Sequence, residues 1–71
     1  MTDNIILTGK EIEKLKEIYD KCRCNVVLSQ HKHKGIENCI FVQTQEAYND
    51  GSQVYVDITD YEAKRQWQIN R

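Results

Sequence analysis

Three cysteines and two histidines are the side chains of this sequence best suited to binding a metal ion. They are Cys22, Cys24, His31, His33 and Cys39. Thiolate and imidazole ligands suit Zn²⁺, which prefers four of them in a tetrahedron. The C-x-C and H-x-H spacings, however, differ from the ligand pairs of zinc fingers and ribbons. Lysines also flank the histidines and disfavour a cation, so we expect neither a metal nor another cofactor.

The same residues contain a thiol and an imidazole that could act together in nucleophilic catalysis. Cys24 or Cys39 could lie beside His33 across a hairpin, with the imidazole as the base. The sequence has only three glycines and contains no glycine-rich phosphate loop, nucleophile elbow or HExxH motif. A chain of 71 residues also has little room for both a core and a catalytic cleft. We therefore expect a protein that is not an enzyme.

Charge is unevenly distributed along the chain, although the net charge is only −1. Residues 35–62 contain six acidic residues, three tyrosines and no lysine or arginine, whereas the segments before and after them are net positive. Carboxylates and phenols on one surface suit contact with a basic site of a larger protein. The residues predicted to form this partner-binding surface are Glu46, Tyr48, Asp50, Tyr55, Asp57, Asp60, Tyr61 and Glu62. A solvated face that only keeps the protein soluble would give the same pattern.

Basic and aromatic residues elsewhere suggest nucleic-acid or nucleotide binding as the alternative function. The residues that would carry it are Lys21, Arg23, Lys32, Lys34, Arg65 and Trp67. A sheet could also present Phe41 and Tyr55 for stacking on bases. The nearly neutral net charge argues against this alternative, because nucleic-acid-binding domains are usually strongly basic.

A helix is predicted from Lys10 to Cys22. Thr8 and Glu11 have the spacing of a capping box, in which the two residues satisfy the first free backbone N–H groups of a helix. The apolar positions then recur every three or four residues, which places them on one helix face and turns the lysines and glutamates to water. Those apolar positions are Ile12, Leu15, Ile18, Tyr19 and Cys22.

Three strands are predicted after this helix, at 25–28, 39–44 and 53–58. The third alternates cleanly between apolar and polar residues. Asp50-Gly51 is a strong hairpin signal between the last two strands, and Gly35 suits the reversal between the first two. The strands should form an antiparallel meander.

The last segment is ambiguous between helix and strand. Thr59 and Glu62 form a second capping-box pattern before good helix formers, while Trp67 and Ile69 are spaced as on a strand face. We favour a short helix. The predicted fold is therefore a small α+β domain spanning residues 1–71, in the order α-β-β-β-α, with 4–7 as an optional edge strand.

The chain carries no signal-like or membrane-spanning apolar run. Its odd number of cysteines argues against a disulfide framework and for a reducing compartment, so we expect a cytoplasmic protein. Small size, high Asn, Ile, Lys and Gln content and the lack of proline are typical of small accessory proteins of bacteriophages and mobile elements. By that analogy we expect a phage-type inhibitor that blocks a functional surface of a host protein, such as a nucleic-acid-binding surface. A core this small would also gain from homodimerisation.

Overall fold

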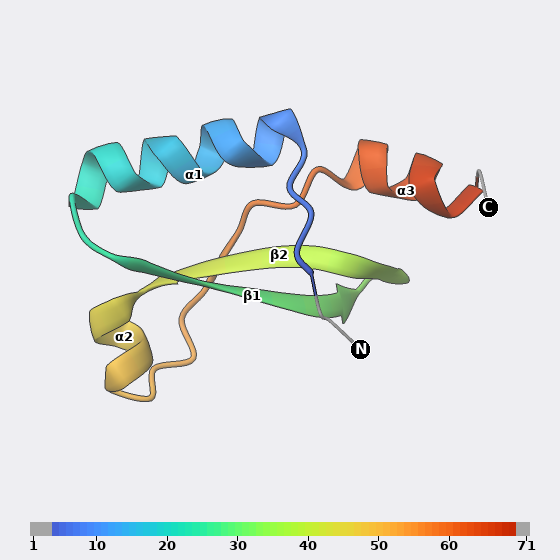
Figure 1. Ribbon diagram of the computed structural model, residues 1–71. Coiled ribbons are helices and arrows are strands. Elements are labelled where there is room, and N and C mark those ends of the chain that lie inside the picture. The colour runs from blue at the N-terminus through green and yellow to red at the C-terminus, as the bar shows by residue number, and fades with distance from the viewer. Residues whose placement is uncertain (1–3, 70–71) are drawn as a thin grey trace.

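The computed structural model describes residues 4–69 and has two long strands, one very short strand and three helices (Figure 1). In chain order the elements are α1 (Gly9–Cys22), β1 (Val26–His33), β2 (Ile36–Thr44), α2 (Gln45–Asn49), β3 (Val56–Asp57) and α3 (Tyr61–Ile69). This confirms the predicted α+β fold with the order α-β-β-β-α. The short helix α2, inserted between β2 and β3, was not predicted.

The sheet is antiparallel, with β2 between β1 and β3. Pairing of β1 with β2 runs from Val26 opposite Thr44 to His33 opposite Ile36, so both strands are longer than predicted. Lys34 and Gly35 form the turn between them, with φ of 53° and 79°. Two consecutive positive φ angles are typical of a type I′ turn, whose twist matches that of the flanking strands.

The predicted strand at 53–58 is reduced to the two residues of β3. Its Asp50-Gly51 signal was misread, because this dipeptide ends α2 instead of forming a hairpin: Asp50 is the C-cap and Gly51, with φ of 73°, follows it. The start of α2 is fixed by Thr44, whose hydroxyl accepts a hydrogen bond from the Ala47 N–H at 3.1 Å. Thr44 therefore ends β2 and begins a helix at the same residue.

Both longer helices lie on one side of the sheet, while α2 lies on the other (Figure 1). Ile40, Val42 and Ile58 form the buried centre of the core beneath α1 and α3. The side chains packed around that centre are Leu7, Leu15, Ile18, Val26 and Leu28. On α1 the predicted apolar face is only partly buried, because Ile12 and Tyr19 are 53% and 48% exposed.

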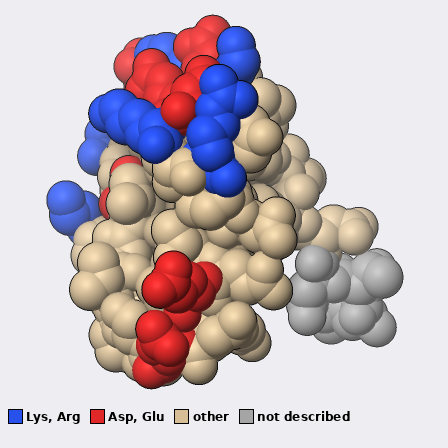
Figure 2. Space-filling view, turned by 90° about the vertical axis from the view of Figure 1, so that its left-hand side faces the viewer, with Lys and Arg blue, Asp and Glu red and all other residues tan. Residues whose placement is uncertain are grey.

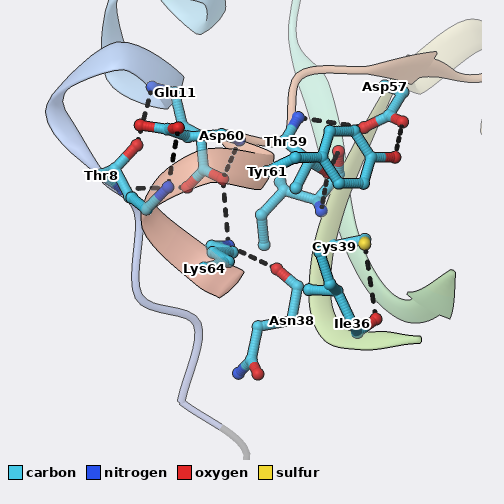
Figure 3. A network of polar contacts seen from close by, with 12 residues as sticks. Thr8, Glu11, Ile36, Asn38, Cys39, Asp57, Thr59, Asp60, Tyr61 and Lys64 are labelled. Carbon is cyan, nitrogen blue, oxygen red and sulfur yellow. Dashed lines mark hydrogen bonds and ion pairs between the residues drawn. The ribbon is translucent and has the colours of Figure 1, made fainter. Parts of the chain in front are cut away.

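Two charged residues, one in α1 and one in α3, are completely buried. The Glu11 carboxylate lies 3.0 Å from the ammonium group of Lys64, and the two side chains are 0% and 1% exposed. Glu11 also accepts hydrogen bonds from the backbone N–H groups of Thr8 at 2.9 Å and Asp60 at 2.8 Å (Figure 3). Lys64 in turn donates to the backbone carbonyl of Asn38 in β2. These contacts join the starts of α1 and α3 to the sheet.

The predicted C-terminal helix is present as α3, but its cap is one residue later than predicted. The Asp60 carboxylate accepts from the Ala63 N–H at 3.2 Å, in the position expected of an N-cap side chain. Thr59 instead contacts the sheet: its hydroxyl accepts a hydrogen bond from the Ile40 N–H at 2.9 Å.

Residues 4–7, the optional edge strand, form no strand. Within residues 4–69, no helix is long and apolar enough to cross a bilayer.

Candidate binding surface on the open face of the sheet

Four rings form a cluster on the sheet face that α1 and α3 leave uncovered. Alternation along β2 turns Phe41 away from the core residues on either side of it. The Phe41 ring centroid is 5.7 Å from that of His31, 5.9 Å from that of His33 and 6.4 Å from that of Tyr55. The tilted and edge-on angles are those favoured by aromatic pairs.

A groove of about 410 Å³ runs beside this cluster, between β1 and the segment that follows α2. Its walls include Val27, His31, Gln43, Tyr48 and Tyr55. The Gln43 side-chain amide donates to the backbone carbonyl of Ser52 at 3.2 Å and ties that segment to β2. The two tyrosines remain 58% and 39% exposed, for Tyr48 and Tyr55 respectively, so the groove is open to a partner.

Acidic side chains lie at the same end of the molecule as Tyr48. Glu46 is in the first turn of α2 and Asp50 is its C-cap, and both are exposed. Figure 2 shows acidic side chains at the lower end, where α2 lies, with no lysine or arginine beside them. The upper end, over α1, mixes both signs of charge. Glu46, Tyr48 and Asp50 therefore form an acidic surface with an exposed phenol.

The side chains of Asp57 and Tyr61 are hydrogen-bonded to each other. The Tyr61 phenol donates to the Asp57 carboxylate, and the Thr59 N–H donates to it at 3.0 Å. Burial opposes ionisation of Asp57, but these hydrogen bonds outweigh it and lower the pKa of the carboxyl. Burial, and then the bond to Asp57, raise the pKa of Tyr61 to about 12. Lys34 and Arg65 lie over the Tyr61 ring, 5.5 and 6.0 Å from its centroid.

The eight residues predicted to bind a partner thus fall into three groups. Glu46, Tyr48 and Asp50 lie around α2; Tyr55, Asp57 and Tyr61 lie near the ring cluster; Asp60 and Glu62 lie at the start of α3. The first two groups meet at the groove, through Tyr48 and Tyr55. Asp60 is occupied in capping α3. Glu62 instead lines a separate depression with Lys10.

The basic residues of the alternative function also separate. Lys21 and Arg23 are at the end of α1, whereas Lys32 and Lys34 are at the opposite end of the sheet, near α3 (Figure 1). Arg65 and Trp67 belong to α3, and the Arg23 guanidinium lies over the Tyr19 ring, 5.5 Å from its centroid.

The sequence argued against a disulfide framework, but the structure contains one disulfide, between Cys22 and Cys24, and Cys39 is a buried free cysteine. The Cys39 thiol donates to the backbone carbonyls of Ile36 and His33, at 3.4 and 3.5 Å. Among residues 4–69, no three His, Cys, Asp or Glu side chains are arranged to hold a metal ion.

The histidines are the part of this surface that sequence reasoning missed. Because they were considered only as metal ligands and, for His33, as a catalytic base, their packing against Phe41 was not foreseen. The signal that could have found them is the strand register: His31 in β1 and Phe41 in β2 have the same alternation, which puts their side chains on one face once the pairing is known.

No protein-family model, curated protein or solved structure matches this chain.

Proposed function

We propose that the chain is a non-enzymatic protein-binding module that recognises a basic site of a larger protein. The single observation that carries this proposal is the groove on the open sheet face, where Tyr48 and Tyr55 are exposed beside an acidic helix. Tyrosine is enriched among the residues that dominate binding energy at protein interfaces. The neighbouring carboxylates supply charge complementarity to a basic partner.

The nature of the partner follows from the acidic groups. Carboxylates on Glu46 and Asp50 present negative charge in the way that phosphates do, so they suit a host surface that normally binds nucleic acid. Occupying such a surface would make the chain an inhibitor. The size and composition of the chain support a bacteriophage accessory protein of this kind.

The test is capture of partners from bacterial lysate by the tagged full chain, followed by mass spectrometry. Replacing both groove tyrosines, with Tyr48→Ala and Tyr55→Ala, should weaken binding of the captured partner by at least about 2 kcal/mol, or roughly 30-fold. The charge reversals Glu46→Lys and Asp50→Lys should weaken it too and reduce its salt dependence.

The matched control reverses charge on α1 with Lys14→Glu and Lys16→Glu. Both lysines are exposed on the opposite side of the sheet from the groove, so binding should remain within a factor of two. If the control abolishes binding while the tyrosine variant binds normally, the interface is not on the open face.

Nucleic-acid or nucleotide binding is the second candidate, favoured by one specific observation. Lys34 and Arg65 converge on the Tyr61 ring at the edge of the ring cluster, so cations and stacking surfaces lie together. Titration of mixed-sequence DNA and RNA at several salt concentrations distinguishes the candidates. Affinity that falls steeply with salt, and that Lys34→Glu removes, would favour this alternative over protein binding.

A further inference from the structure

The disulfide at the end of α1 joins two residues that belong to the same short bend. Cys22 is the last residue of α1, and Arg23, its C-cap, has a left-handed backbone with φ of 52°. That bend brings Cys24 back toward Cys22, with their Cα atoms 5.2 Å apart. The helix end is itself secured by the Arg23 N–H, which donates to the Tyr19 carbonyl at 2.7 Å.

This disulfide connects no separate elements of the fold. A bond between residues two positions apart closes a very small loop and so removes little conformational freedom from the unfolded chain. The cap bond from Arg23 to Tyr19 does not involve sulfur. Opening the disulfide should therefore leave the fold intact, which would not be true of a structural staple.

A groove of about 440 Å³ adjoins Cys22 and Cys24. It is lined by Cys22, Cys24, Asn25, Thr44, Gln45 and Glu46. The Asn25 side chain donates to the Gln45 side chain at 3.0 Å, and the Gln45 N–H donates to the Asn25 carbonyl at 2.9 Å, so this wall is fixed. Amide and hydroxyl groups at fixed positions suit the backbone of a short peptide.

We propose that Cys22 and Cys24 form a thiol–disulfide exchange site whose substrate is a cysteine thiol on a short peptide. The substrate thiolate attacks the sulfur of Cys22, because Cys22 is an exposed residue and Cys24 is half-buried. A mixed disulfide to Cys22 forms, the bond between Cys22 and Cys24 breaks, and Cys24 leaves as a thiolate that takes up a proton. A second substrate thiolate then attacks the substrate sulfur, forms the substrate disulfide and releases Cys22 as a thiol.

Two cationic residues flank Cys22 in sequence, Lys21 before it and Arg23 after it. They attract the carboxylates of a peptide substrate. Exposed disulfides of this kind, where they occur in reducing compartments, are transient and catalytic or redox-sensing.

Glutathione, a tripeptide thiol, is the probe for the test. Reduced glutathione added to the oxidised full chain should open the disulfide, as shown by the mass of the alkylated protein, while the circular dichroism spectrum remains unchanged. Loss of helical signal on opening would mean that the bond is a staple and would overturn the proposal. So would recovery of both thiols in free form after treatment with excess oxidised glutathione.

Two serine variants test which sulfur exchanges. With oxidised glutathione, Cys24→Ser should form the mixed disulfide at Cys22 at least tenfold faster than Cys22→Ser forms one at Cys24. Buried Cys39 is present in both variants and should stay unmodified, which provides an internal control. In these variants the remaining protein thiolate attacks glutathione disulfide, so equal rates would mean that Cys22 is no more accessible to a glutathione sulfur than Cys24, which would contradict the assignment of Cys22 as the exchanging residue. Because none of these variants changes the groove tyrosines, the outcome is independent of partner binding.

Discussion

The carboxylate of Glu11 and the ammonium group of Lys64 are 3.0 Å apart in a place that water does not reach. Removing one partner leaves the other charge buried and unpaired, which typically costs about 3–5 kcal/mol. That is close to the whole stability expected of a core this small, which is roughly 3–5 kcal/mol. Glu11→Gln and Lys64→Met should therefore each unfold the protein or shift its urea midpoint close to zero.

A double variant separates the pair from its surroundings. Because Glu11→Gln with Lys64→Met leaves no uncompensated charge, its loss of stability should be smaller than the sum of the two single losses. The measurement is urea unfolding followed by circular dichroism. Additive losses would mean that the two charges do not interact in solution.

Stability should depend on pH through Asp57 and Tyr61. The pKa of Asp57 is lowered in the folded state, so its contribution is present above pH 3.8 and is lost as pH falls through the lower folded value. The pKa of Tyr61 is raised from 10.0 to about 12, so its contribution is present below pH 10 and is lost as pH rises toward 12. Thermal unfolding across both ranges measures the two slopes.

Tyr61→Phe is the variant that links these two slopes. It removes the phenol, so the alkaline loss should disappear, and it removes a donor to Asp57, so the acid loss should become shallower. If the loss of stability at alkaline pH persists unchanged in Tyr61→Phe, a group other than Tyr61 causes it.

The cap of α3 can be assigned by comparing two neighbouring substitutions. Asp60→Ala removes the side chain that accepts from the Ala63 N–H, and loss of such a cap costs about 1 kcal/mol. Glu62→Gln should change stability by less than about 0.5 kcal/mol, because Glu62 is exposed and takes no part in that cap. If Glu62→Gln costs more stability than Asp60→Ala, the predicted capping box of Thr59 and Glu62 forms in solution and Thr59 is the cap. Chemical denaturation of the two variants decides between them.

Self-association remains a prediction, and the fold changes which edge should carry it. The third strand, predicted to be the longer free edge, has two residues, whereas β1 is an edge strand of eight residues and contains no proline. Long edges of this kind pair readily with a second copy. Light scattering at high micromolar concentration should therefore show a particle above 8.4 kDa, and Val27→Lys in β1 should reduce it. A monomer at that concentration would contradict the prediction.

How much the sequence predicted depended on the range over which each interaction acts. The capping box of Thr8 and Glu11 involves neighbours in sequence, and it is present as predicted. The second role of Glu11, pairing with Lys64, depends on how α3 is placed, and no local pattern contains that information. Asp50-Gly51 is a second case in which the local sequence does not determine the structure. The dipeptide supports a hairpin or a helix end equally well, and the cap at Thr44 decided for the helix.

The candidate surface also shows this difference between local patterns and long-range contacts. Alternation predicted which β2 residues face inward, but the meeting of His31 with Phe41 required the register of β1 against β2. The eight-residue acidic surface was inferred from composition along one segment. In the structure this surface is divided into separate groups, because Asp57, Asp60 and Tyr61 make hydrogen bonds within the fold.

The position of the buried ion pair also bears on how the protein is made. Glu11 is near the start of the sequence and Lys64 is in its last helix, so α1 cannot complete its packing while the ribosome still encloses residue 64. During synthesis the Glu11 carboxylate must stay hydrated until Lys64 is available to pair with it. Contacts between distant parts of a chain form late, after more local ones such as the β1–β2 turn. The junction between the starts of α1 and α3 should therefore be the last part of the fold to form.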